Sequence, residues 1–321
     1  MRKAFFIILP ILWCFFSCAP KDRTEDTIAK IPIDLKISRF DQEFAQAIPQ
    51  DIPNLKKKYP FLFPQQFADS IWIAKLQDTL QHELRDEVQV SFSRMPQEEL
   101  EIASLFQHIK YYFPSFKEPQ AITLISDVDY QNRIIWADSL LLIGLDNYLG
   151  ADHKFYAGLS KYIRADLDRQ YLVGDIAQAF AKSVVPPPSD RTFLANCIYY
   201  GKELYLKELL IPNKTDAQKI GYTDDQLGWA EANEAQIWRY FVERELLYST
   251  DTKLSARFLD PAPFSKFQLA FDNESPGRIG RYMGWQIVRA FMAQNNTLSL
   301  TQMLSLPATE IFEKANYKPK K

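Results

Sequence analysis

A carboxylate interrupts the apolar face of a helix predicted over residues 224–248. The helix begins at a capping box, in which Thr223 and Gln226 satisfy each other's backbone amides. Its buried face follows from apolar residues at helical spacing: Leu227, Ala230, Ile237 and Phe241. Glu234 falls on that face, one turn before Trp238. Burying a lone carboxylate is very costly, so Glu234 either forms a structural ion pair with an arginine of another helix or contacts a ligand or substrate.

Two arginines near the start of a second helix are candidates for binding an anion. That helix is predicted over residues 277–294, and Arg278 and Arg281 lie in its first turns, beside the positive end of the helix dipole. Together they could hold a carboxylate, and Glu234 is one candidate partner; a pair of solvated arginines is the alternative. Small residues on or near one face predict that this helix packs tightly against a neighbour: Gly277, Gly280 and Gly284.

A third helix, predicted over residues 190–210, carries polar side chains that could face a cleft: Tyr199, Lys202 and Glu203. Inside a helix, Gly201 costs about 1 kcal/mol relative to alanine, and its usual role is to admit a second backbone at close range. Cys197 has no partner motif around it. It is therefore predicted to be a small buried hydrophobic residue rather than a nucleophile.

The elements that position these residues are mainly helical. Glycine is scarce, with 10 in 321 residues, which favours helices over a loop-rich β architecture. Short apolar or alternating runs predict strands over residues 31–40, 121–126, 133–137 and 140–145. Apolar residues at three- and four-residue spacing predict further helices over 65–88, 97–112 and 299–314. We therefore expect an α+β fold that is predominantly α-helical with a small central β-sheet.

The first residues of the chain have the composition of a secretory signal. A short basic stretch is followed by a thirteen-residue apolar run and then by Ser17 and Cys18; a transmembrane helix needs roughly 20 residues. Cys18 resembles the lipidated cysteine of a lipobox, although Phe15 stands where that pattern has leucine. An ordinary signal peptide with an incidental cysteine is the alternative. The prediction divides the chain into a lipoprotein signal peptide (1–17), a lipidated cysteine and tether (18–30) and a single globular domain (31–321).

Several uncommon clusters, in their order and spacing, resemble the gliding motility lipoprotein GldB family. They are YYGK at 199–202, LIP at 210–212, GYT at 221–223, NE at 233–234, IW at 237–238, APF at 262–264, SPGRIG at 275–280 and GWQIV at 284–288. The likeness covers nearly the whole mature chain. It implies a cell-envelope protein needed for gliding, related to machinery that also exports proteins across the outer membrane. It implies no defined biochemical activity.

A more distant likeness is to gluzincin-type zinc metallopeptidases, and it implies a zincin-like, degenerate metallopeptidase architecture. Those enzymes bind zinc through H-E-x-x-H on one helix and a glutamate on a later helix. Asn233-Glu234 resembles the later glutamate. The helix over 190–210 is the place for the histidine pair, but the chain's three histidines, His82, His108 and His153, form no such pair. We therefore expect no metal and no cofactor.

These observations favour a non-catalytic binding or assembly component of the gliding motility machinery. Its cleft or binding surface is predicted to include six residues: Tyr199, Glu203, Glu234, Trp238, Arg278 and Arg281. The alternative is a hydrolase or peptidase with a rearranged site, in which Glu234 acts as general acid or base. A periplasmic solute-binding lipoprotein ranks third, because the chain lacks two alternating βα lobes.

The expected partners follow from the anchor and the charge. The lipid on Cys18 would hold the protein on the inner or the outer membrane, facing the periplasm, and the remaining surface would bind other gliding or secretion envelope proteins or a peptide. The formal net charge of -2 gives no basic field, so nucleic acid is not expected as a partner.

Overall fold

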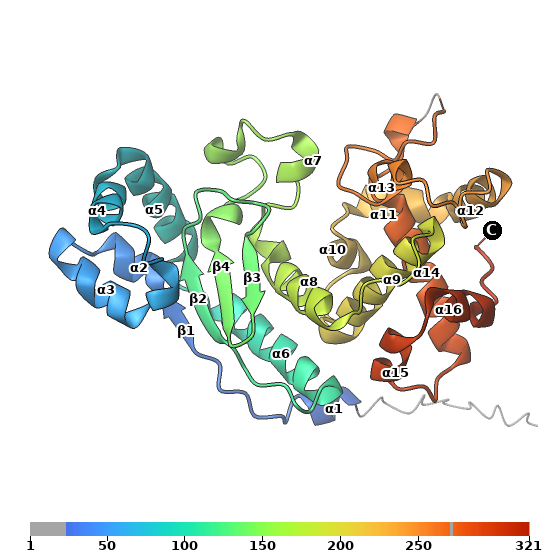
Figure 1. The fold of residues 1–321 in the computed structure, drawn as a ribbon, viewed down its shortest axis with the longest axis horizontal. Coiled ribbons are helices and arrows are strands. Elements are labelled where there is room, and N and C mark those ends of the chain that lie inside the picture. Colours follow the sequence, from blue (N-terminus) through green and yellow to red (C-terminus); the bar gives the residue numbers. More distant parts are fainter. Residues whose placement is uncertain (1–23, 270–271, 321) are drawn as a thin grey trace, which may run out of the picture.

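A four-stranded mixed sheet forms the centre of the N-terminal half of the molecule (Figure 1). Its strands lie in the order β1 (Ile37–Arg39), β2 (Gln120–Leu124), β4 (Leu140–Gly144) and β3 (Ile134–Ala137). The pairs β1–β2 and β2–β4 are parallel, and β3–β4 is antiparallel. The four predicted strands are therefore present, although β1 covers only the last part of the predicted 31–40 strand: residues 31–36 form neither strand nor helix, and a helix begins at Phe40.

The computed structural model describes residues 24–269 and 272–320. The predicted lipidation site, Cys18, lies outside the described residues, as does the predicted signal peptide. The helices of the first half are α1 (Thr24–Ile28), α2 (Phe40–Ala45), α3 (Ile52–Lys58), α4 (Asp69–Gln77), α5 (Thr79–Phe92) and α6 (Pro96–Tyr112). Those of the second half are α7 (Lys161–Arg164), α8 (Leu172–Val184), α9 (Phe193–Leu210), α10 (Asp216–Ile220), α11 (Asp224–Ala232), α12 (Glu234–Glu243), α13 (Lys253–Phe258), α14 (Ile279–Gln294), α15 (Leu300–Ser305) and α16 (Ala308–Ala315).

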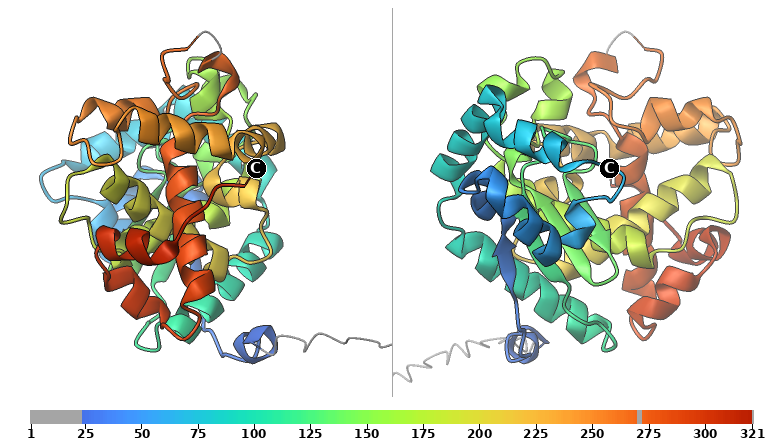
Figure 2. Two further views of the ribbon diagram at one scale, coloured as in Figure 1. Left: turned by 90° about the vertical axis from the view of Figure 1, so that its right-hand side faces the viewer. Right: turned by 60° about the vertical axis from the view of Figure 1, so that its left-hand side comes forward.

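Alternate strand residues face two different hydrophobic cores, as the two-residue period of a strand requires. Ala121 and Leu141 belong to the larger core, together with residues of α6, α8 and α9. Ile122 belongs to a smaller core formed with α2, α3 and α4. The sheet is thus covered on both faces, and its larger core continues into the helical half of the molecule (Figures 1 and 2).

The helical half is built around the contact between α9 and α14, with α15 and α16 beside them (Figure 2). A Cβ placed on Gly201 of α9 would overlap the backbone of Gly284 of α14, and a Cβ on Gly284 would overlap the carbonyl of Cys197. The predicted close approach at Gly201 and the tight packing of the glycine-rich helix are both confirmed. Cys197 is buried at this crossing, as predicted, and burial raises the pKa of its thiol.

Three of the predicted helices are interrupted where a local side-chain or proline effect competes with the helix. The predicted 65–88 helix breaks at Asp78, which caps α5 by accepting from the Gln81 amide. The predicted 299–314 helix breaks before Pro307, because a proline disfavours helical geometry at the preceding residue. The predicted 224–248 helix breaks at Asn233, whose side-chain amide donates to the Trp229 carbonyl.

The predicted tether also contains folded structure. The helix α1 lies within residues 18–30, and Ile28 is buried. His108 of α6 forms a hydrogen bond with the Glu25 carboxylate at 3.2 Å, and Gln107 of the same helix donates to the Ala29 carbonyl. At least the second half of the predicted tether therefore packs on the domain. Among the described residues, no helix is long and apolar enough to cross a membrane.

Candidate functional site

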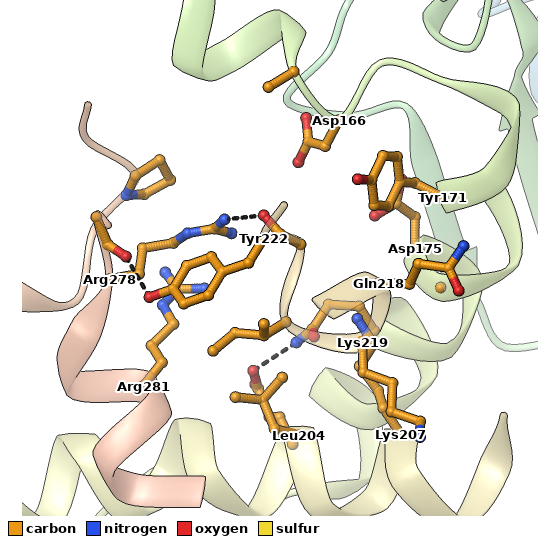
Figure 3. Close-up of a pocket in the computed structure, with 18 of the residues that line it drawn as sticks. Asp166, Tyr171, Asp175, Leu204, Lys207, Gln218, Lys219, Tyr222, Arg278 and Arg281 are labelled. Carbon is orange, nitrogen blue, oxygen red and sulfur yellow. Dashed lines mark hydrogen bonds between the residues drawn. The ribbon is translucent and has the colours of Figure 1, made fainter. Parts of the chain in front are cut away.

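A polar pocket of about 630 Å³ lies between the sheet half and the helical half of the molecule (Figure 3). Its walls come from the segment before β3, from α7 and α8, from α9, from the turn between α10 and α11, and from the start of α14. Its volume is within the range of small-molecule sites. Five tyrosines line it: Tyr130, Tyr162, Tyr171, Tyr200 and Tyr222.

One wall of the pocket holds an arginine that is neutralised by two aspartates. Arg133 donates to both oxygens of Asp166 at 3.1 and 3.2 Å, and its Nε lies 2.8 Å from Asp175. The Tyr148 hydroxyl donates to the other side of this cluster, 2.9 Å from Asp175. Burial alone would lower the pKa of Arg133, but the Asp175 and Asp166 carboxylates hold it well above its usual value. This wall is therefore a closed ion-pair network.

The opposite wall holds Arg278 and Arg281, which enter the pocket from the start of α14 beside Tyr222 (Figure 3). The Arg278 side chain donates to the Gly221 carbonyl at 2.7 Å. The Tyr222 hydroxyl donates to the Gly277 carbonyl at 2.5 Å, and the two bonds tie the α10–α11 turn to the start of α14. Arg278 itself has a left-handed backbone, with a φ of 61°, which costs roughly 1–2 kcal/mol for a residue with a Cβ.

Arg281 donates a hydrogen bond only from its Nε within the described residues, so the two terminal nitrogens of its guanidinium can donate to a ligand. The Nε donates to the Leu259 carbonyl at 2.6 Å, and the guanidinium lies over the Tyr200 ring, 4.0 Å from its centroid. Burial and the nearby Arg278 lower the pKa of Arg281. In the described part of the chain, neither arginine has a carboxylate within 4.0 Å. The candidate pairing of these arginines with Glu234 is therefore wrong, because Glu234 bonds to Tyr282, Tyr317 and the Lys320 amide instead.

The helix α9 contributes Glu203 and Lys207 to the pocket. Gln178 of α8 donates to Glu203 at 2.6 Å, while the second oxygen of this carboxylate is buried without a hydrogen bond. Burial raises the pKa of Glu203, and the nearby Tyr199 phenol and Lys182 partly offset that rise. Lys207 is 5% exposed, and its ammonium has no hydrogen bond or ion pair within the described residues. Burial lowers the pKa of Lys207 to about 8.

Glu234 lies outside this pocket and is saturated by hydrogen bonds. It is 2% exposed and accepts from the Tyr282 hydroxyl at 2.8 Å, from the Tyr317 hydroxyl at 2.7 Å and from the Lys320 backbone at 3.0 Å. Burial and the Glu234 carboxylate raise the pKa of both tyrosines. The ion pair expected between Glu234 and an arginine is therefore replaced by two phenols and an amide.

The geometry of α14 explains that difference. Successive helical residues point about 100° apart, so Arg281 faces the pocket while Tyr282 faces Glu234. The break at Asn233 also makes Glu234 the first residue of α12 instead of an interior residue. Trp238, one turn later, packs against Tyr317 with the ring centroids 5.1 Å apart. Glu234 and Trp238 therefore hold the C-terminal segment and do not line the pocket.

The other predicted residues divide between the two regions. Tyr199 lies beside Glu203 but is not part of the pocket lining, whereas its neighbour Tyr200 is. Lys202 turns away and donates to the Leu304 and Leu306 carbonyls at 2.9 and 2.7 Å, so it secures the end of α15. Of the predicted set, the pocket thus brings together Glu203, Arg278 and Arg281.

Sequence reasoning missed the residues that complete the pocket: Arg133, Asp166, Asp175, Lys207 and Tyr222 as a lining residue. Lys207 carried a usable signal, because it lies one turn after Glu203 and has Leu204 and Leu210 three residues away on either side, on the same helix face. Arg133 and Asp166 carried none, since their pairing depends on how two distant loops meet. In the part of the chain that the structure describes, no group of three or more His, Cys, Asp or Glu side chains is placed to hold a metal ion.

The fold and the pocket together define a predominantly helical α+β protein with a charge-lined pocket beside its sheet. Residues 21–319 match the family described as gliding motility protein GldB, and the chain therefore belongs to the GldB family. No curated protein and no solved structure matches the chain. The likeness to zinc metallopeptidases thus gains no support from these comparisons.

Proposed function

We propose that this chain is a lipid-anchored, non-catalytic binding component of the gliding motility machinery, and that its pocket takes a peptide segment of an envelope partner. Family membership supports the link to gliding motility. The pocket carries the rest of the proposal: it combines tyrosine walls with an arginine pair and a buried lysine that form no ion pair with a carboxylate of the described residues.

The pairing of the pocket's two aspartates with an arginine favours binding over catalysis. Asp166 and Asp175 are paired with Arg133, and Glu203 is held by Gln178. The described lining residues include no histidine, serine or cysteine. Glu234, the centre of the alternative hydrolase, is sealed beneath two tyrosines and the C-terminal segment. Its arrangement favours a structural role.

The anchor in this proposal is the lipid on Cys18, with the domain facing the periplasm. In gliding cells that lack their own copy, the full chain should restore spreading on agar. Cys18→Ser should move the protein from the membrane fraction to the soluble periplasmic fraction and abolish spreading. If the substituted protein stayed in the membrane fraction, the lipid anchor would be excluded.

The pocket is tested in the same cells with two arginine variants. Arg278→Gln combined with Arg281→Gln should abolish spreading at a normal protein level, whereas Arg257→Gln should not. Chelator-sensitive cleavage of peptides by the purified full chain, lost in Glu203→Gln, would overturn the non-catalytic assignment. Normal spreading of the double variant would overturn the role of the pocket.

A further inference from the structure

The arginine wall of the pocket has unused hydrogen-bond donors at short range. The bonds of Arg278 to Gly221 and of Arg281 to Leu259 each use one nitrogen of the guanidinium, so each side chain keeps further N–H groups without a protein acceptor in the described residues. Both arginines lie on the same side of the pocket (Figure 3), and the charge of Arg278 is near enough to lower the pKa of Arg281. Each guanidinium lies against a tyrosine ring, that of Tyr222 for Arg278 and that of Tyr200 for Arg281. Two positive charges held this way repel each other, and an anion bound between them would offset that repulsion.

The floor of the pocket has a second unused donor. Lys207 is almost fully buried and makes no hydrogen bond within the described residues, although it lines the pocket. The charged groups around it come from different elements: Asp175 of α8, Glu203 of α9, Arg278 beside α14, and Arg133 before β3. The nearby Asp175 is paired with Arg133, and no ion pair joins it to the Lys207 ammonium within the described residues. Because Lys207 lines the pocket, an oxygen of a bound ligand can accept a hydrogen bond from its ammonium.

The charges of the lining favour an acidic ligand over a basic one. Six lining side chains are basic (Arg133, Lys182, Lys207, Lys219, Arg278 and Arg281) and three are acidic (Asp166, Asp175 and Glu203), a formal difference of +3. The acidic groups lie in the ion-pair network or against Gln178, whereas the unused donors are all cationic.

We infer that the pocket recognises a carboxylate of its peptide ligand, either the chain terminus or an acidic side chain. The carboxylate lies between Arg278 and Arg281, where guanidinium groups can donate paired hydrogen bonds to it. Lys207 donates to an oxygen of the peptide that the arginines do not bind, and the tyrosines of the pocket pack along the peptide backbone. This inference rests on the proposed function for the nature of the ligand, but the carboxylate subsite is tested by binding alone.

The experiment uses the full chain in detergent micelles and four capped peptides. Acetyl-Ala-Ala-Glu with a free carboxyl terminus has two carboxylates, and its C-terminal amide has only the side-chain carboxylate. Acetyl-Ala-Ala-Gln with a free terminus has only the terminal carboxylate, and acetyl-Ala-Ala-Gln amide has no carboxylate. Titration calorimetry should show that the neutral peptide binds at least about tenfold more weakly than the best acidic one, which is the effect of losing a charge-assisted hydrogen bond. The comparison of the two singly charged peptides identifies which carboxylate is read.

Arg257 provides a matched control for Arg281. Its Nε also donates to a backbone carbonyl, that of Lys266 at 2.8 Å, and its guanidinium also lies over an aromatic ring, that of Phe258, but it is not part of the pocket. Arg281→Gln should weaken binding of the best acidic peptide about tenfold, and Arg257→Gln should change it less than about twofold. If Arg281→Gln unfolds the protein, Arg278→Gln replaces it.

Three results would overturn the inference. Equal binding of the neutral and acidic peptides would exclude a carboxylate subsite, and so would equal losses in Arg281→Gln and Arg257→Gln. Inorganic phosphate, titrated alone, tests the other source of the same chemistry; phosphate binding that is tighter than that of every peptide would assign the arginine pair to a phosphate group instead. None of these binding results decides the spreading assays that test the proposed function. The carboxylate subsite and the role in gliding can therefore be rejected independently.

Discussion

Gly201 of α9 and Gly284 of α14 meet backbone to backbone at the crossing of the two helices. These helices position three of the pocket's cationic residues, Lys207, Arg278 and Arg281. Neither position has room for a Cβ, because the opposing main chain occupies that space. The crossing sets the distance between Lys207 on α9 and the arginines at the start of α14. The glycine pair is therefore a positioning contact for the pocket as well as a packing contact of the core.

Gly284→Ala should destabilise the protein strongly. The new methyl group would overlap the Cys197 carbonyl, and backbone cannot move aside as a flexible side chain can. Overpacking costs about 1–3 kcal/mol and more where backbone must shift, so the midpoint of thermal unfolding should fall by several degrees. Gly228→Ala is the matched control: Gly228 is an exposed residue of α11 with nothing within 4 Å of its added Cβ, and alanine there should stabilise the helix by about 0.5–1 kcal/mol. Equal effects of the two substitutions would contradict the close crossing.

Glu234→Ala should release the C-terminal segment while leaving the pocket intact. The substitution removes the acceptor for Tyr282, Tyr317 and the Lys320 amide together, and it leaves the Tyr282 hydroxyl buried without a partner. Such a loss costs about 1–3 kcal/mol for each unsatisfied buried group. Limited proteolysis should cut the chain within 316–320 faster than in the unsubstituted protein, and binding of acidic peptides should be unchanged. Loss of peptide binding without faster proteolysis would return Glu234 to the functional site.

The elements were predictable from the sequence to a greater extent than the site. Periodicity located the strands and the helices α6, α9 and α14, because each buries one face of regular spacing. The glycine motif predicted close packing correctly at Gly201, since few other roles suit a glycine inside a helix. Periodicity did not predict helix breaks such as the one at Asn233, because the apolar pattern continues across the break although the helical backbone is interrupted there.

The pocket was predicted only in part, for a physical reason. Arg281 and Glu203 lie on helices, and Arg278 directly precedes one, where charged residues stand out from an apolar background. Whether such a residue faces a pocket or another core depends on its angle around the helix, and one step along α14 separates Arg281 from Tyr282, which faces Glu234. Partners such as Arg133 come from loops, where no periodicity indicates a direction.

Lys207→Met should stabilise the protein and weaken peptide binding. Lys207 is charged at neutral pH although burial lowers its pKa from 10.5 to about 8. This difference means that keeping the ammonium charged in the folded protein costs on the order of 3 kcal/mol of stability. Methionine has a similar length and no charge to desolvate, so the midpoint of thermal unfolding should rise by a few degrees. Lys219→Met is the control, because Lys219 also lines the pocket but is paired with Asp216 at 3.3 Å. A lower midpoint in Lys207→Met would show that the ammonium has a stabilising partner.

The free energy of unfolding should rise between pH 8 and pH 10 and fall at higher pH. Burial lowers the pKa of Lys202 and of Lys207 to about 8 in the folded protein, whereas both stay near 10.5 when unfolded. Between these values the unfolded chain binds more protons, so stability increases with pH. Above pH 10 the sign reverses, because burial raises the pKa of tyrosines such as Tyr222 and only the unfolded chain ionises them. Urea unfolding of the full chain at unit pH steps measures both limbs. Lys202→Met combined with Lys207→Met should remove the rise and keep the fall; a rise that persists in the double variant would assign it to other groups.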